Sequence, residues 1–162
     1  MRLATGALLL ILISGETGKA QTVGTPNLGN EEASGTIAGG SGEVYTVYGA
    51  TPEQGAALRE QIRVMHPTVL PARVFFVPHW KYLDNARIFQ LHVPTGYASV
   101  MFTHLPSRTV FVDNDRYLGK EWLGHWIAHE LGHLDSNSAK EEDAERVAHK
   151  LRTALKESQK KS

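Results

Sequence analysis

The sequence lacks cysteine, a net charge and a hydrophobic run long enough to span a membrane. The absence of cysteine from its 162 residues excludes a disulfide framework, a thiol nucleophile and a cysteine-ligated zinc site. Any metal ligands must then come from histidine, aspartate and glutamate. The 17 basic and 17 acidic residues balance, so the net charge gives no reason to expect nucleic acid as a partner.

The first 20 residues have the pattern of a secretory signal peptide. Arg2 precedes an apolar run over residues 3–14, and the small-x-small tripeptide Gly18-Lys19-Ala20 follows. We expect cleavage after Ala20 and a mature protein that is secreted or periplasmic, with an uncleaved anchor as the alternative. The run is shorter than the roughly 20 residues of a membrane span, so no stable span is expected after cleavage.

The remaining chain divides by composition into a linker and one domain. Residues 21–42 are rich in Gly, Thr, Ser and Asn and poor in apolar residues, which predicts a flexible linker. Residues 43–158 are numerous enough to bury a single core. We expect one domain there, and a monomer.

The motif His129-Glu130-Leu131-Gly132-His133 is the most informative part of the sequence. In a helix the two histidines lie one turn apart on one face, so both imidazoles can reach one Zn²⁺. The glutamate between them is placed to take a proton from a metal-bound water. A helix over residues 121–134 is predicted by an apolar stripe nearly opposite the histidines, formed by Leu123, Ile127, Leu131 and Leu134.

Zinc hydrolases usually take a third protein ligand, and the next helix is the place to look for it. A metzincin would have its third histidine at position 139, which is Ala139, so that class is excluded. A helix beginning near Ser138 is predicted by an apolar face of Ala144, Val147, Ala148, Leu151 and Leu155. Glu141 lies beside this face and is the best-placed ligand. The competing interpretation is a capping box, in which Glu141 accepts a hydrogen bond from the Ser138 amide.

The two helices together resemble a known pattern. HELGH followed by Glu141-Glu142-Asp143-Ala144-Glu145 looks like the gluzincin signature of HExxH and then ExxA(D/N), and the match covers residues 122–150. The short chain is similar to the minimal gluzincins and to ImmA/IrrE-like metallopeptidases. The resemblance implies that Glu141 is the third zinc ligand and that position 145 orients a histidine ligand. This chain has Glu145 where the pattern has Asp or Asn.

The rest of the domain is predicted to be α+β. Thr51, Pro52 and Gln54 start a helix that ends near His66. Strands are predicted over residues 72–77, 98–104 and 109–113, the last two as a hairpin, while residues 78–91 are ambiguous. This order resembles a minimal zincin-like fold: a small twisted sheet with a hairpin, packed on a metal-bearing helix and a second ligand-bearing helix. By that resemblance the first hairpin strand is a sheet edge along which an extended substrate pairs.

Several other side chains are candidates for supporting roles. His125 lies one turn before His129, but three histidines in a row span about 12 Å of helix, too far for one ion. It is either a half-exposed histidine or part of a cleft. Candidate donors to the oxyanion of a tetrahedral intermediate are Tyr97, His104, Tyr117 and His149. His149 is favoured because it continues the row of Glu141 and Glu145 in steps of four.

The sequence therefore predicts an exported zinc metallopeptidase that hydrolyses protein or peptide substrates with Glu130 as general base. The alternative is a non-catalytic metal-binding or protein-interaction domain that retains the fold. Glu130 favours catalysis, because a structural zinc has no use for a free carboxylate beside an open coordination position. The ImmA/IrrE resemblance also suggests repressor cleavage, but an exported protein would not meet such targets, so the substrate stays open.

Overall fold

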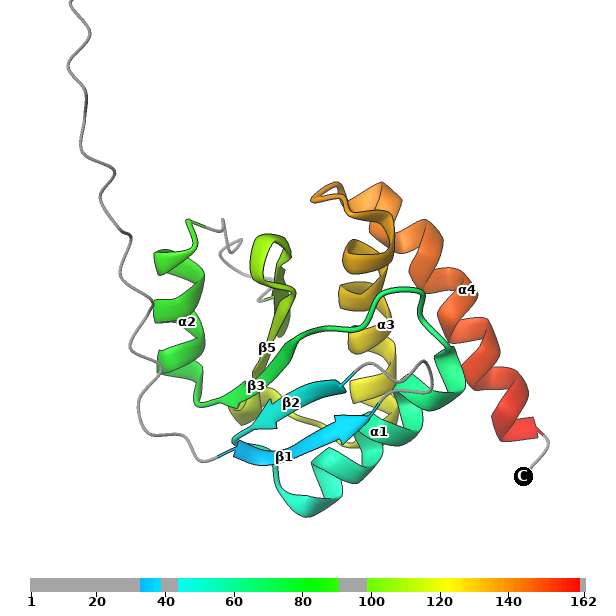
Figure 1. Ribbon diagram of the computed structural model, residues 1–162, viewed down its shortest axis with the longest axis horizontal. Coiled ribbons are helices and arrows are strands. Elements are labelled where there is room, and N and C mark those ends of the chain that lie inside the picture. The colour runs from blue at the N-terminus through cyan, green and yellow to red at the C-terminus, as the bar shows by residue number, and fades with distance from the viewer. Residues whose placement is uncertain (1–32, 39–43, 91–98, 161–162) are drawn as a thin grey trace, which may run out of the picture.

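The computed structural model describes residues 33–38, 44–90 and 99–160, which form one mixed sheet and four α-helices (Figure 1). The strands are β1 (Ala33–Ala38), β2 (Val44–Tyr48), β3 (Arg73–Val77), β4 (Met101–His104) and β5 (Thr109–Asp113). The helices are α1 (Pro52–Met65), α2 (His79–Ile88), α3 (Lys120–Ser136) and α4 (Glu141–Lys160), with 3-10 turns η1 (Leu105–Ser107) and η2 (Asn114–Arg116). The α+β class is as predicted. The expected signal peptide and linker residues 21–32 and 39–42 lie outside the described residues. Among the described helices, none is long and apolar enough to cross a membrane.

The described strands are ordered β1-β2-β3-β5-β4. The three central strands run parallel, whereas β1 and β4 pair antiparallel at the two edges. β4 and β5 form the predicted hairpin, with Met101 opposite Val112 and His104 opposite Thr109. Their connection is η1, closed by Arg108 in the left-handed conformation. The first hairpin strand is therefore an edge strand, as expected.

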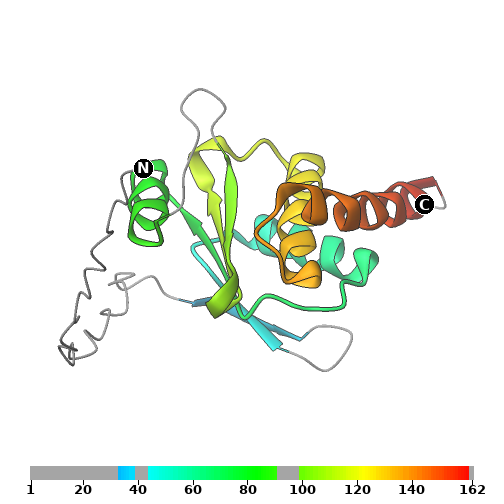
Figure 2. The same ribbon diagram turned by 90° about the horizontal axis from the view of Figure 1, so that it is seen from above.

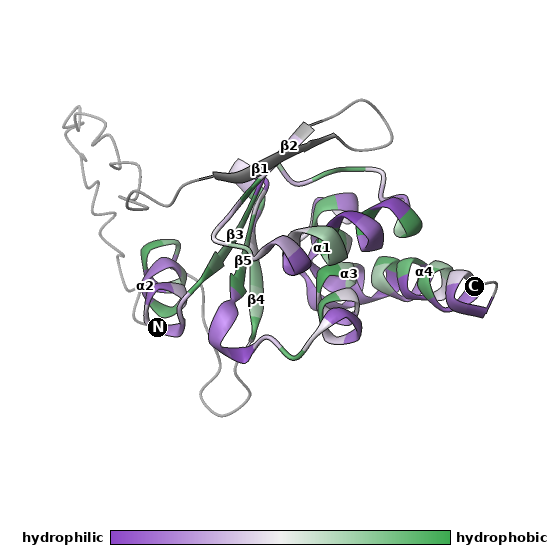
Figure 3. Cartoon of the chain, turned by 90° about the horizontal axis from the view of Figure 1, so that it is seen from below, coloured by the Kyte–Doolittle hydropathy of each residue, from purple (hydrophilic) through white to green (hydrophobic). Residues whose placement is uncertain are grey.

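Side chains alternate across the sheet and fill an apolar layer on each face. On one face Val74, Val110 and their neighbours pack with residues of α1, α3 and α4. On the other face Phe75 and Phe111 pack with Tyr82 of α2. Figure 3 shows the same division, with α2 on one side of the strands and the other three helices opposite. The segment that the sequence left ambiguous is thus mainly a helix that covers one face.

Residues 33–38 form an edge strand, although their composition predicted a flexible linker. β1 pairs antiparallel with β2, and its register sets Thr36 opposite Thr46 and Ile37 opposite Tyr45. Main-chain hydrogen bonds to a neighbouring strand supply this order, and composition does not reveal them. The linker prediction is wrong for these residues.

α1 forms where its capping signal predicted. The Gln54 N–H donates to Thr51 Oγ1 at 3.2 Å, and the Thr51 N–H donates to Gln54 Oε1 at 2.8 Å. These two bonds satisfy amides that the first helical turn leaves unpaired. His66 ends the helix in the left-handed conformation, with φ of 49°. The bonds fix the residue at which α1 begins.

α3 and α4 lie side by side and approach closely at one point (Figure 2). The predicted apolar stripe of α3 is buried and consists of Leu123, Ile127, Leu131 and Leu134. A Cβ placed on Gly132 would lie 2.3 Å from the carbonyl oxygen of Ala144, so only a glycine fits there. α4 begins at Glu141, slightly later than predicted, and the hydroxyl of Ser138 accepts a hydrogen bond from the Lys140 N–H.

We expect Gly132→Ala to lower the free energy of unfolding by about 1–3 kcal/mol, because the added methyl collides with backbone and forces the helices apart. Urea denaturation followed by circular dichroism measures the change. Gly55→Ala is the control, since its Cβ would meet nothing closer than Arg59 Nη1 at 3.7 Å. That variant should be neutral or stabilised by up to about 1 kcal/mol. Wild-type stability in Gly132→Ala would contradict the close contact.

Candidate metal centre

Two histidines of α3 and one glutamate of α4 converge where these helices meet. The rings of His129 and His133 have centroids 4.9 Å apart and planes at 88°. Glu141, the first residue of α4, places Oε2 2.9 Å from His129 Nε2 and Oε1 3.7 Å from His133 Nε2. One ligand atom from each residue lies within 4.8 Å of the other two. This group can hold a metal ion.

The donor set suits a divalent transition metal. Two imidazole nitrogens and one carboxylate are a common ligand set for zinc, each about 2.0–2.2 Å from the ion, so ligand atoms are roughly 3–4 Å apart. The observed separations of 2.9 and 3.7 Å are close to that range. The side chains of His129 and His133 are 16% and 12% exposed, whereas that of Glu141 is 77% exposed. Solvent therefore reaches the group from the Glu141 side.

Glu141 does not form the capping box that was its competing interpretation. The Ser138 N–H donates to the carbonyl oxygen of His133 at 3.2 Å. The Ser138 hydroxyl donates to Asp143 at 2.9 Å. The carboxylate of Glu141 is therefore directed at the histidines, which is the arrangement that a ligand requires.

The Nδ1 atom of each ring has its own acceptor. His129 Nδ1 lies 3.2 Å from Glu145 Oε2, and His133 Nδ1 lies 2.8 Å from the carbonyl oxygen of Ser138. A proton on Nδ1 leaves Nε2 of both rings unprotonated and able to bind a metal. Partial burial raises the pKa of Glu145, but hydrogen bonds from Arg152 and His129 outweigh this and lower it. Glu145 is therefore kept as an ionised acceptor.

Glu130 lies between α3 and the edge strand β4. Its side chain is buried, with 3% of the residue exposed, and the Thr103 hydroxyl donates to Oε2 at 2.8 Å. Burial raises the pKa of this carboxyl group, and the hydrogen bond from Thr103 opposes that rise. The neighbouring His133 and His129 also favour the ionised form. A carboxylate with raised proton affinity therefore stands beside the candidate ligands.

No family model, curated protein or solved structure matches this chain. The resemblance to the gluzincins therefore stays a prediction from the motif residues.

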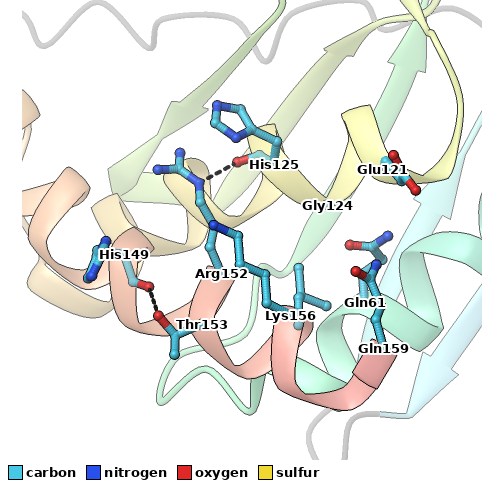
Figure 4. A pocket seen from close by; sticks show the side chains of 10 residues that line it. Gln61, Glu121, Gly124, His125, His149, Arg152, Thr153, Lys156 and Gln159 are labelled. Carbon is cyan, nitrogen blue, oxygen red and sulfur yellow. Dashed lines mark hydrogen bonds between the residues drawn. The ribbon is translucent and has the colours of Figure 1, made fainter. Parts of the chain in front are cut away.

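His149 does not join the three candidate ligands. It is exposed, and it lines a pocket of about 430 Å³ between α3 and α4 together with His125 and Arg152 (Figure 4). His125 lies one turn before His129, and His149 one turn after Glu145, so the pocket adjoins the metal group along both helices. Burial lowers the pKa of His125, and the positive charge of Arg152 lowers it further.

The other predicted oxyanion donors are not brought to the site by the described structure. His104 stacks on Phe89 at 4.1 Å between centroids, on the α2 face of the sheet, whereas Thr103 faces α3. The alternation of side chains along a strand makes this difference unavoidable. Tyr117 packs edge-on against Trp122. Tyr97 lies outside the described residues.

Three groups around the site were not found from the sequence: the Thr103 hydroxyl, the Ser138 carbonyl and the Arg152 guanidinium. Threonine is an ordinary strand residue, and a main-chain carbonyl has no sequence signature. A basic residue in the C-terminal half of a helix is favourable without any partner, so Arg152 does not stand out in the sequence. Its spacing of seven from Glu145, two turns along one side of the helix, is the signal that points to their pairing.

We expect Zn²⁺ to raise the melting temperature of the metal-free protein and EDTA to reverse the effect, because a ligand that binds only the folded state stabilises it by about 2.7 kcal/mol at 100 times its Kd. Glu141→Ala should abolish most of this stabilisation. Differential scanning fluorimetry with and without metal measures it. Glu142→Ala, which removes an exposed carboxylate from the next position, is the control and should respond like the wild type. Equal zinc responses in both variants would contradict ligation by Glu141.

The stability of the folded protein should depend on pH through His104. Burial, helped by Arg73, lowers the pKa of His104 below 6.5. As the pH falls, His104 is therefore protonated in the unfolded chain before it is protonated in the folded protein. The stability that neutral His104 contributes is complete above about pH 6.5 and is lost as the pH falls towards the folded-state pKa. His104→Gln should lose less stability than the wild type when the pH falls from about 7.5 to about 5.5. Urea denaturation at both values tests this, and an unchanged pH dependence would contradict it.

Proposed function

We propose that this protein is a zinc-dependent metallopeptidase of the gluzincin type that hydrolyses peptide bonds in proteins or peptides. One observation carries the proposal: Glu141 reaches both histidines of the HExxH motif while Glu130 is buried directly beside them. A zincin-like arrangement of the sheet and the two ligand helices is part of the same proposal.

The residues divide the chemistry between them. Zn²⁺ held by His129, His133 and Glu141 would polarise the scissile carbonyl and acidify water. Glu130 takes the proton from the attacking water and passes it to the leaving amine. Its raised pKa suits this role, because a stronger base accepts the proton more readily at neutral pH. Glu145 contacts His129 through Nδ1 and would leave its Nε2 available to the metal.

The edge strand suits an extended peptide. β4 has a paired neighbour, β5, on one side only among the described strands. Thr103, in the middle of β4, contacts Glu130, so a peptide added along this edge would pass close to the general base. Main-chain bonds would supply much of its affinity. The substrate class is therefore an unfolded or flexible polypeptide.

We further propose that the protein acts outside the cytoplasm as a monomer, after removal of residues 1–20. The basic residue, apolar run and Gly18-Lys19-Ala20 tripeptide support export. Repressor cleavage, which the ImmA/IrrE resemblance suggests, is not part of the proposal.

Glu130→Gln tests the catalytic role. We expect the variant to bind Zn²⁺ like the wild type and to lose about 10²–10⁴-fold in the rate of casein cleavage, because it keeps the shape of the side chain but cannot take a proton. Released peptides and metal content are measured on the same preparations. Glu121→Gln makes the same change at an exposed position of α3 and should retain activity.

Three outcomes separate the alternatives. Cleavage by Glu130→Gln at the wild-type rate would contradict the general-base role. Zinc binding without cleavage by either protein would favour a non-catalytic metal-binding domain, in which Glu130 serves only to hold Thr103 of β4. Absence of zinc from the wild type would overturn the metal site itself.

A further inference from the structure

Glu145 has a long and largely exposed side chain, although it contacts the candidate metal ligand His129 and so affects the orientation of that ring. Its side chain is 54% exposed, yet its Oε2 lies 3.2 Å from His129 Nδ1. An exposed carboxylate on a flexible stem loses rotamer freedom when it is held in one place, and bulk water competes for its oxygens. The hydrogen bond to His129 alone is a weak restraint, so a second contact on Glu145 would decide its position.

Arg152 supplies that contact. Its Nη1 is ion-paired with Glu145 Oε1, the oxygen that does not face His129. Its Nε donates to the main-chain carbonyl oxygen of His125 at 3.1 Å, as Figure 4 shows. The guanidinium therefore joins α3 to α4, and its side chain is only 17% exposed. Both partners of Arg152 belong to the helices that carry the candidate ligands.

We propose that Arg152 is a positioning residue of the metal site, which acts on His129 through Glu145. The proposal rests on the metal centre of the proposed function, and does not depend on peptidase activity. A planar guanidinium presents several N–H donors in a fixed geometry, so one group can hold a carboxylate and a carbonyl at once. Lysine at this position would keep the charge but lose that geometry.

The physical consequence is a fixed orientation of the imidazole. With Glu145 held, a proton on His129 Nδ1 keeps a fixed acceptor, and Nε2, 2.9 Å from Glu141 Oε2, is the atom that would bind the metal. Without Arg152, Glu145 is free to turn into water and the Nδ1 proton loses its fixed acceptor. Arg152, two turns beyond Glu145 on α4, thus holds the Glu145 carboxylate in place as the acceptor for His129 Nδ1.

Zinc affinity, measured by competition with a chromogenic chelator, tests the proposal. We expect about a tenfold loss for Arg152→Met, a similar loss for Glu145→Ala, and an intermediate value for Arg152→Lys. In the double variant, Arg152→Met should add nothing to the loss caused by Glu145→Ala, because it acts through that residue. Arg63→Met removes an exposed arginine paired with Glu60 on α1 and should leave the affinity unchanged.

Two spectroscopic measurements distinguish positioning from general destabilisation. The Co²⁺-substituted wild type and Arg152→Met should differ in their visible ligand-field bands, while Arg63→Met matches the wild type. In the metal-free protein, ¹⁵N NMR of the imidazoles should show a hydrogen-bonded proton on His129 Nδ1, and this proton should exchange with water much faster in Arg152→Met, where Glu145 is no longer held. This second readout requires no metal and remains decisive if the wild type binds none.

Additive losses in the double variant, or unchanged exchange of the His129 Nδ1 proton in Arg152→Met, would overturn the proposal. Failure of the wild type to bind Zn²⁺ would instead overturn the metal centre. Arg152→Gln, which keeps a hydrogen-bond donor of intermediate length, replaces Arg152→Met if circular dichroism shows that the methionine variant does not fold.

Discussion

The contact between α3 and α4 at Gly132 and Ala144 determines whether the candidate site exists. The methylene hydrogens of Gly132 face the carbonyl oxygen of Ala144, where a methyl group would lie only 2.3 Å away. Because Ala144 follows Glu141 by less than one turn, the distance between the helices at this point also sets the reach of Glu141 to the histidines. The glycine inside HELGH is thus a packing residue with a direct effect on the ligand geometry. Burial of the apolar stripe of α3 holds the helix against the sheet and fixes the other half of that distance.

The edge strand imposes a second constraint, on Glu130. The carboxylate is nearly excluded from water, which favours its neutral form, and the Thr103 hydroxyl favours the ionised form. Burial is the larger of the two effects, so the pKa of Glu130 is raised, which suits the proposed role of this residue as a general base. The sheet contributes to the pKa of Glu130 directly, since a strand shifted by one residue would turn Thr103 away and bring Phe102 or His104 to its place.

Sequence reasoning found the parts of this protein that depend on local spacing. The helix of the HExxH motif, the capped start of α1 and the hairpin of β4 and β5 each follow from neighbours within a few residues, and the structure has them. Placement of Glu141 beside the histidines follows from two helical periodicities and a short loop. Strand β1 was missed because a Gly- and Ser-rich segment acquires order only from its partner β2. His104 and His149 were candidates by residue type, and their distance from the ligands depends on which face of a strand or helix they occupy in the assembled fold.

The two α4 carboxylates that contact His129 are held by their helix rather than by burial. Glu141 and Glu145 are both largely exposed, so burial does not hold them; the helix backbone and its docking on α3 do. One turn of α4 separates them, and they contact opposite nitrogens of the same ring. A displacement of α4 would therefore weaken metal ligation and imidazole orientation together. A metal ion bound at the proposed site would in turn favour the docked position of α4, because a ligand that prefers one arrangement of two elements stabilises that arrangement by its difference in affinity. The stability of the α3–α4 contact and the affinity of the site are thus two measures of one coupled equilibrium.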